Sequence, residues 1–567
     1  MNRRLFYVIA SVAMLLLSLL ALAFSPLASA GTLTCPVSSN LTISTTVNNV
    51  ASSCIVDFGV TLTIADTGDL ANVGPSGSGI LENNGTLANY GAFTNDLLQT
   101  FTNFGTVFNN NYMDMGGGTF TNASIFDNFG TVTDTFSDGT LNNTATFTND
   151  GSMTLFDTFN NFAGAHFNNV GFLYLGSSLA QPLQATNNGT LTNFTGGDLE
   201  IVTPFTNNGS LVNAGTLGNG NAAGTAPPTF INNGTITNNG SFTNGAAVSK
   251  GFGSLVASFS NNGTFDNVDT LTSYSEFDNN AGASVINEKG ATFTIDDSFG
   301  GSFLNAGSLT NNGSLIVGNG RLLDQSWVVN NGSITNSDGF VGVGVLATLT
   351  NAASSTFLQT GGQTKVDGTL NNSVGSTFLQ TGGDTMINGI LNSVPAVQIQ
   401  GGTLSGFGQI NGNVSNTGGI VEPGSLGIGG ALNINGDYTQ GSGGTLTIDF
   451  DGSAPGDFSV LDVTGLAALD GTVDFEALNG FTPVAGDDFT FLLFGSLSGD
   501  FTTIDFTNWT CPTGDSCTEV LGANNLSLDI TGPQTTPTPE PASLLLLGTG
   551  ILLIGRCSRR KKSPEIG

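Results

Sequence analysis

The chain has 567 residues, of which 81 are glycine and 41 are phenylalanine, and its 42 aspartate and glutamate residues far outnumber its 11 lysine and arginine residues. A net charge of −31 at pH 7 argues against nucleic acid or an anionic lipid surface as a partner, because both need cationic side chains for neutralisation. Five cysteines and one histidine, His166, show no spacing typical of a zinc site. We therefore expect no nucleic acid partner, no metal and no cofactor.

The first 30 residues have the features of a secretory signal peptide. Arg3 and Arg4 precede an apolar run that extends to Phe24, and small residues at Ala28 and Ala30 form the cleavage pattern. The paired arginines leave a twin-arginine route open, although the long leucine-rich run favours the general secretory route. Both routes export the chain, so the mature protein is expected to begin near residue 31.

The next segment, 31–83, is predicted to be an N-terminal cap region. It contains Cys35 and Cys54, and a second pair, Cys511 and Cys517, lies near the end of the folded region. Each pair brackets a short loop, and disulfides are expected in exported proteins. We predict one disulfide at each end of the fold; the alternative is four unpaired buried thiols.

Residues 84–402 repeat a short unit in which Asn-Gly-Thr/Ser is followed by an apolar residue. Several copies are about 20 residues apart, and the segment from Ser355 to Gly362 returns almost unchanged 21 residues later. The unit begins at Asn84, Asn188, Asn208, Asn233, Asn262, Asn312 and Asn331. A repeat of this length predicts an all-β parallel β-solenoid of ~20-residue rungs, on the order of 70 Å long for about 15 rungs.

In that solenoid the Asn-Gly pairs are predicted to form the corners, with glycine chosen because it tolerates positive φ. The alternation of polar and apolar residues after each corner places one apolar side chain inward per short strand. Stacked rungs then bury a continuous core and allow asparagine and threonine side chains to pair along the stack. Helices are disfavoured by this composition, a propeller needs a longer unit, and regularly spaced phenylalanines argue against disorder.

Residues 403–530 are predicted to form a glycine-rich stretch followed by an all-β C-terminal section, with strand-like alternations at 445–450, 473–475, 489–491 and 526–530. The run from Gly429 through Asp449 resembles the end of autotransporter-type passenger domains. That resemblance implies a secreted, β-helical stalk, which in those proteins is often adhesive. Autotransport itself is not expected here.

The last segments are a stiff Pro/Thr linker, 531–538, and a sorting signal, 539–567. In the signal an extended tripeptide, an apolar run of about 14 residues and a basic cluster follow one another. As a helix the run would reach only ~21 Å, against roughly 30 Å of bilayer hydrocarbon, so it suits a short transmembrane sorting helix better than a permanent anchor. The residues assigned to sorting and processing are Pro539, Glu540, Pro541, Arg556, Arg559 and Arg560.

This order of segments resembles the PEP-CTERM sorting signal. The resemblance implies recognition by an exosortase, an integral-membrane processing enzyme of Gram-negative bacteria that make extracellular polysaccharide. It also implies a transient inner-membrane intermediate with the basic tail in the cytoplasm, before release to the cell surface or extracellular matrix. The alternative is an ordinary C-terminal membrane anchor.

No catalytic residues are expected. Asp296-Asp297 and Asp487-Asp488 nominally supply the paired carboxylates of a glycosidase, but adjacent strand residues point to opposite faces, so we interpret both pairs as turn or edge acids. His166 is predicted to be an outward strand residue. Asp449-Phe450-Asp451-Gly452 loosely resembles a calcium loop, without the glycine-aspartate repeat of calcium-loaded β-rolls.

The sequence therefore predicts an exported, acidic rod with a structural or adhesive role, associated with extracellular polysaccharide. The alternative function is a polysaccharide-degrading enzyme, either a glycoside hydrolase or a lyase, on the same β-helical scaffold.

Overall fold

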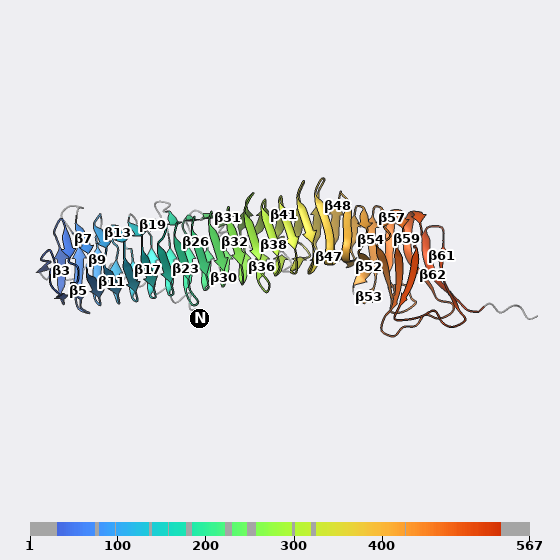
Figure 1. The fold of residues 1–567 in the computed structure, drawn as a ribbon, viewed down its shortest axis with the longest axis horizontal. Coiled ribbons are helices and arrows are strands. Elements are labelled where there is room, and N and C mark those ends of the chain that lie inside the picture. The colour runs from blue at the N-terminus through green and yellow to red at the C-terminus, as the bar shows by residue number, and fades with distance from the viewer. Residues whose placement is uncertain are drawn as a thin grey trace, which may run out of the picture.

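The protein is a long rod built from short strands (Figure 1). It was analysed as a computed structural model that describes residues 31–73, 79–96, 98–134, 139–156, 158–176, 184–220, 229–245, 257–296, 301–318, 325–425 and 427–533. In these residues all of the assigned elements are β-strands. The predicted all-β class is confirmed.

The strands stack into three faces, each of which runs the length of the rod. Face 1 consists of β4 (Cys54–Val56), β7 (Ile80–Asn83), β10 (Thr100–Asn103), β13 (Thr119–Asn122), β16 (Thr140–Asn143), β19 (Thr158–Asn161), β22 (Ala185–Asn187), β25 (Phe205–Asn207), β28 (Thr229–Asn232), β31 (Ser258–Asn261), β34 (Glu276–Asn279), β37 (Ser302–Asn305), β40 (Trp327–Asn330), β43 (Thr348–Asn351), β46 (Thr369–Asn372), β48 (Ile390–Ser393), β50 (Gln409–Asn411) and β54 (Ala431–Asn435). Face 2 consists of β2 (Leu41–Ile43), β5 (Thr61–Ile64), β8 (Thr86–Asn89), β11 (Thr106–Asn109), β14 (Ile125–Asn128), β17 (Thr146–Asn149), β20 (His166–Asn169), β23 (Thr190–Asn193), β26 (Ser210–Asn213), β29 (Thr235–Asn238), β32 (Thr264–Asn267), β35 (Ser284–Asn287), β38 (Ser308–Asn311), β41 (Ser333–Asn336), β44 (Thr356–Gln359), β51 (Val414–Asn416) and β55 (Tyr438–Gln440). Face 3 consists of β1 (Gly31–Thr32), β3 (Thr46–Asn49), β6 (Asp69–Asn72), β9 (Ala92–Asn95), β12 (Tyr112–Asp114), β15 (Thr131–Thr133), β18 (Ser152–Leu155), β21 (Phe172–Leu175), β24 (Asp198–Ile201), β27 (Thr216–Asn219), β30 (Ser241–Asn244), β33 (Thr270–Ser273), β36 (Thr292–Ile295), β39 (Ser314–Val317), β42 (Phe340–Val343), β45 (Gln363–Val366), β52 (Ile420–Ser425), β56 (Thr445–Phe450), β58 (Thr472–Ala477) and β60 (Thr503–Thr507).

Each strand pairs in parallel with the strand one coil before it and the strand one coil after it. The register aligns like residues, so that Phe101 lies beside Phe120 and Asn103 beside Asn122. Two long strands, β47 (Thr377–Ile387) and β49 (Val397–Gly406), run from face 2 into face 3, and their pairing shifts register where they bend. This is the predicted parallel β-solenoid.

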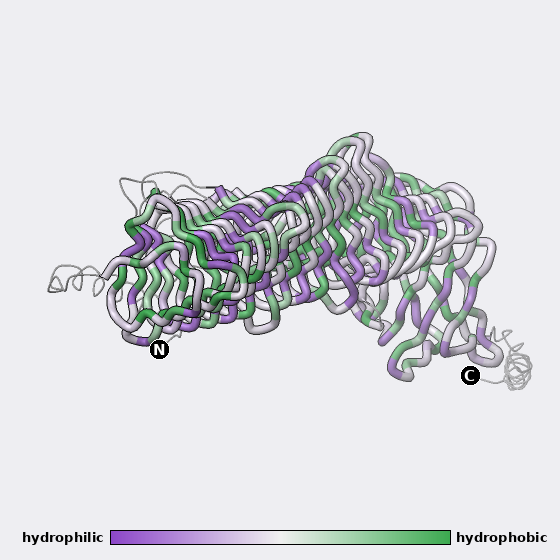
Figure 2. Tube along the Cα trace, turned by 60° about the vertical axis from the view of Figure 1, so that its left-hand side comes forward, coloured by the Kyte–Doolittle hydropathy of each residue, from purple (hydrophilic) through white to green (hydrophobic). Residues whose placement is uncertain are grey.

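The core follows from the alternation within each strand. In a typical strand such as β10 the second and fourth residues are buried, while the first and third face outward. The second position holds the apolar residues, and many phenylalanine rings stack along the axis, as Phe126, Phe147 and Phe167 do with centroid distances of 4.3 and 4.8 Å. Figure 2 shows the resulting bands of similar hydropathy that run along the rod.

The fourth position holds a buried asparagine on faces 1 and 2. The Nδ2 of each asparagine donates to the Oδ1 of the asparagine one coil on, at 2.7 to 2.9 Å from Asn83 to Asn372 on face 1. A second ladder of the same kind runs on face 2 from Asn89 to Asn336. Because buried amides are costly when unpaired, these ladders fix the register between coils.

The glycines of the Asn-Gly corners serve a different purpose from the one predicted. At Gly85, Gly209 and Gly234 φ is not positive, but a Cβ there would lie 2.0 to 2.1 Å from a backbone oxygen of the preceding coil. Glycine is needed because the backbones of successive corners approach so closely, and not because of its φ.

The coils are also less uniform than predicted. Successive ladder asparagines on face 1 are 18 to 29 residues apart. Most of this variation arises at the corner that leads from face 3 to face 1, which connects Ser273 to Glu276 in one coil but Asn244 to Ser258 in another. The other two corners stay short, so the ladders remain in register.

The parallel pairing of strands continues on both sides of residues 84–402, so no break in pairing marks either predicted boundary. β5 pairs with β8, and β49 pairs with β51 and β52. At the C-terminal end β57 (Val460–Leu469) and β59 (Asp488–Gly499) continue the stack in parallel, and β62 (Asn525–Thr531) and β61 (Ser516–Leu521) then add antiparallel strands. The strand predicted at 445–450 coincides with β56, and those at 473–475, 489–491 and 526–530 lie within β58, β59 and β62.

Candidate functional site

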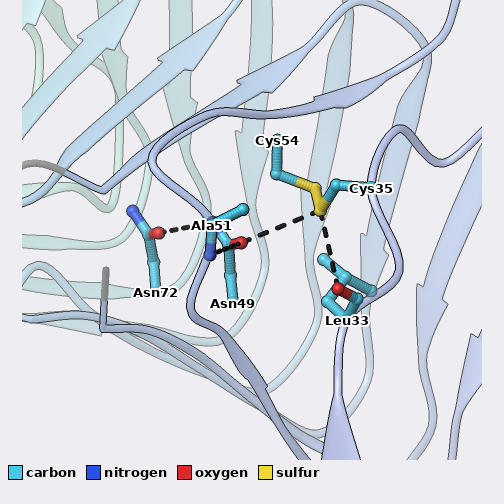
Figure 3. Close-up of a disulfide and its surroundings, with 6 residues drawn as sticks. All are labelled: Leu33, Cys35, Asn49, Ala51, Cys54 and Asn72. Atoms are coloured by element: carbon cyan, nitrogen blue, oxygen red, sulfur yellow. Dashed lines mark hydrogen bonds between the residues drawn. A yellow bond between two sulfur atoms is a disulfide. The ribbon is translucent and has the colours of Figure 1, made fainter. Parts of the chain in front are cut away.

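Both predicted disulfides are present. Cys35 is bonded to Cys54 at the start of face 1, and Cys511 is bonded to Cys517 in β61. Figure 3 shows the first of these next to Asn49, which begins a short asparagine ladder by donating to Asn72 at 2.8 Å. The disulfides therefore lie at the two ends of the coiled region.

The predicted processing residues lie outside the described part of the chain. These are Ala28 and Ala30 at the signal-peptide cleavage site, and Pro539, Glu540, Pro541, Arg556, Arg559 and Arg560 in the sorting signal. Their assignment therefore rests on sequence.

Of the two acidic pairs considered for catalysis, the structure describes both members of one, Asp487 and Asp488. Asp487 is a turn residue whose Oδ2 accepts a hydrogen bond from the Val484 amide at 2.8 Å. Asp488 begins β59 and faces Asp529 on the antiparallel strand. Asp296 is buried after β36, and Asp297 lies outside the described residues.

His166 occupies the first position of β20 and is exposed, in register between Thr146 and Thr190. The prediction of an outward strand residue is confirmed.

A cluster of carboxyl groups that the sequence analysis did not identify lies on the outer side of face 3 near the C-terminal end. Asp449 on β56 is 1% exposed, Glu422 on β52 is 8% exposed, and the two side chains are hydrogen-bonded. Glu476 on β58 lies in register with Asp449. Burial, together with the charges of Glu422 and Glu476, raises the pKa of Asp449 to about 7, and burial also raises the pKa of Glu422.

Asp449 is thus a buried residue within the strand β56. Among the described residues, no three or more acidic, histidine or cysteine side chains are grouped so that they could hold a metal ion.

A shallow groove of about 680 Å³ follows the corner between face 2 and face 3 over five successive coils. Lys289 lies at one end, and its Nζ forms an ion pair with Asp338 at 3.0 Å, two coils further on. Phe340, Gln363 and Asp384 line the rest of the groove. The groove thus combines an aromatic ring with polar side chains. No sequence motif indicates it, because its residues come from different coils.

The outer surface also carries an exposed amide ladder at the corner between face 1 and face 2. Asn188, Asn208, Asn233, Asn262 and Asn280 are linked in that order by side-chain hydrogen bonds of 2.7 to 2.8 Å. Four of these are the asparagines of Asn-Gly-Thr/Ser triplets, which formally match an N-glycosylation acceptor. The Nδ2 atoms of Asn208, Asn233 and Asn262 donate within the ladder, whereas Asn188 accepts through its Oδ1.

Taken together, these features define the protein as a parallel β-solenoid, consistent with the passenger-like region inferred above. Residues 537–561 match the family described as PEP-CTERM protein-sorting motif. The chain therefore carries a sorting motif of exported, surface-directed proteins, consistent with processing by an exosortase-like enzyme. No curated protein matches the chain in sequence.

The described residues contain no helix that is long and apolar enough to cross a membrane. The predicted C-terminal sorting helix lies outside them.

Proposed function

We propose that the protein is a structural or adhesive rod of the cell surface or extracellular matrix, which acts by associating with extracellular polysaccharide. The observation that carries the proposal is the sorting motif at residues 537–561, joined to a rod that displays outward rows of threonine, serine and asparagine. Hydroxyl and amide groups in rows are suited to hydrogen-bond the hydroxyls of a polymer that lies along the rod.

The charge of the rod supports a partner of this kind. The described part contains two cationic side chains, Lys289 and Lys365, and each is ion-paired with an aspartate. A partner that depends on cationic neutralisation is therefore disfavoured.

Processing and location form the second part of the proposal. The chain passes through an inner-membrane intermediate in a Gram-negative host, an exosortase-like enzyme cleaves it near Pro539-Glu540-Pro541, and the rod is then released to the surface or matrix. The role requires neither cofactor nor catalysis.

The test uses protein from the native host, fractionated into inner membrane, outer surface and medium. Mass spectrometry of the C-terminal peptide should show an end near Pro539 to Pro541 in the surface or matrix fraction, and that protein should bind the host's own extracellular polysaccharide. A chain that retains Gly567 in the inner-membrane fraction, or a processed rod that does not bind polysaccharide, would contradict the proposal.

The alternative function that we propose is polysaccharide cleavage, for which the groove is the candidate site. Asp338 and Asp384 both line it, although Asp338 is held in an ion pair with Lys289. If the rod is a hydrolase, it will shorten the host polysaccharide, and Asp338→Asn and Asp384→Asn will each abolish that shortening. A purified rod that leaves the polymer length unchanged rejects this alternative.

A further inference from the structure

Exposed apolar side chains are concentrated on one part of the rod. Between residues 84 and 194, face 2 and its two bordering corners carry eight large apolar side chains that are each 36 to 54% exposed, namely Tyr90, Phe104, Phe108, Ile125, Phe129, Phe162, Val170 and Phe194. Over the described residues from 205 to 340, the same face and corners carry one, Val268. Exposed apolar side chains that gather on one face in this way mark a candidate interaction site.

The aromatic residues occupy positions that the fold does not require to be aromatic. Phe104 follows the ladder residue Asn103 and precedes a glycine, and the same position holds Asn208 five coils further on and Asn233 six coils further on. There the position builds the exposed amide ladder instead. The corner therefore accepts either residue type, and the aromatic ring is not explained by packing.

The rings are arranged along the axis. Tyr90 and Phe129 lie at the same corner two coils apart, because β8 pairs with β11 and β11 pairs with β14. With a spacing of about 4.8 Å per coil, they are roughly 10 Å apart along the rod. Phe104 stands at the opposite corner, in the coil between them.

The polar groups of face 2 in the coils that follow these three rings indicate the type of ligand. The outward positions of β17, β20 and β23 present Thr146, Thr148, His166, Asn168 and Thr190. These hydroxyl, imidazole and amide groups form hydrogen bonds without requiring a charged partner.

Charge further narrows the choice of ligand. Asp127 and Asp150 are the charged residues of this surface, and no cationic side chain is found on it among the described residues. They disfavour a polyanion or an anionic lipid surface, and a second copy of the rod would bring the same acidic charge. A neutral polysaccharide suits both the aromatic rings and the polar groups of this surface. Each sugar ring has an apolar C–H face that packs on an aromatic ring, and its hydroxyls bond to polar side chains.

We propose that face 2 between residues 84 and 194, with its two corners, is a binding strip on which a neutral polysaccharide chain lies parallel to the rod. Sugar rings pack on the aromatic side chains at the corners, and their hydroxyls bond to the polar rows between them. This assignment rests on the proposed function and adds the location of the site and the class of polysaccharide.

The test replaces three rings by the residue that equivalent corners already carry, in the triple variant Tyr90→Asn, Phe104→Asn and Phe129→Asn. Equivalent positions hold Asn239 and Asn208, so the variant should fold, which circular dichroism and thermal melting will check. The matched control is Trp327→Thr, which removes an exposed aromatic residue from face 1, where the next coil has threonine in register.

Binding is measured with the full-length exported protein and two probes, the neutral and the acidic fractions of the host's extracellular polysaccharide, separated by anion exchange. We expect the wild type and Trp327→Thr to bind the neutral fraction, and the triple variant to bind it about tenfold more weakly or worse.

Unchanged binding by the folded triple variant, or preference of the wild type for the acidic fraction, would overturn the strip while leaving the proposed function in place. A wild type that forms dimers which the triple variant loses, with unchanged polysaccharide binding, would assign the strip to self-association. Failure of the wild type to bind either fraction would reject the proposed function itself.

Discussion

Replacing Asp449 by asparagine is expected to stabilise the C-terminal part of the rod at neutral and alkaline pH. The Asp449 carboxyl is buried beside Glu422 and Glu476, with Asp384 also contributing negative charge to Glu422, and its pKa is raised from 3.8 to about 7. Asparagine has nearly the same shape as a protonated aspartate and keeps a donor for Glu422.

The direction of the pH effect on stability follows from the difference in proton binding between the folded and unfolded states. In the unfolded chain the Asp449 carboxyl ionises near its usual value, but in the folded protein it stays protonated up to about pH 7. The folded state therefore binds the extra proton, and the stability that this group contributes is fully present below the unfolded pKa and is lost as pH rises through the folded pKa.

The full difference in pKa corresponds to about 4 kcal/mol, and because Glu422 shares the repulsion we expect about 2 to 4 kcal/mol for the single substitution at pH 8. Near pH 4 the variant and the wild type should have nearly equal stability, because Asp449 is then largely neutral in the folded protein.

Trp509 provides a local reporter for the measurement. It is buried beside Phe506, at a centroid distance of 4.7 Å, and its Nε1 donates to the Phe475 carbonyl at 2.8 Å. Since Trp327 is the other tryptophan, denaturant unfolding followed by fluorescence in the Trp327→Thr background reports on the C-terminal end alone. A matched control is Asp462→Asn, a substitution on the outer side of β57.

Three results would refute the reasoning. The first is a free energy of unfolding that rises from pH 5 to pH 8 in the wild type but stays constant in the Asp449→Asn variant. The second is an Asp449→Asn protein that is less stable than the wild type at pH 8. The third is an equal gain in the control.

Three further predictions concern the coils themselves. Asn232→Ala should lower the free energy of unfolding by about 2 to 4 kcal/mol in a denaturant titration, because it removes the side-chain acceptor of the Asn207 Nδ2 and the side-chain donor to the Asn261 Oδ1. Gly209→Ala should destabilise the rod by more than about 2 kcal/mol in the same assay, since its Cβ would lie 2.1 Å from a backbone oxygen, whereas Gly218→Ala, which has open space around it, should be nearly neutral. The double variant Cys35→Ser and Cys54→Ser should lose about 3 kcal/mol, visible in hydrogen exchange as faster opening of the first coils only, and uniform loss of protection along the rod would contradict a local role.

The fold was predictable because each coil repeats a local sequence pattern. An apolar residue two positions after each corner glycine, as Leu87 is after Gly85, indicates a short strand with one buried face, and the recurrence of that pattern about 20 residues later indicates stacking. The cysteine pairs were predictable for a similar reason, since each brackets a short loop.

The identity of the ladder residues, the buried carboxyl groups and the aromatic surface could not be predicted, because they depend on how one coil aligns with the next. The buried ladder contains Asn207, whereas the next residue, Asn208 of the Asn-Gly corner, belongs to the exposed ladder. Only the strand register shows which of the two asparagines is buried. Glu422 and Asp449 meet because β52 stacks on β56, which no local motif reveals. The rings of Phe104 and Phe129 become one surface only when their coils are aligned.

The direction of the ladders has a mechanical consequence for a rod that is held at one end and loaded at the other. Backbone hydrogen bonds between coils, and the asparagine bonds with them, run parallel to the long axis, so a pull along the axis loads one interface at a time. Each coil that peels away releases ~20 residues of chain, roughly 70 Å when extended. Under tension such a rod lengthens stepwise and dissipates work, so it behaves as an extensible tether.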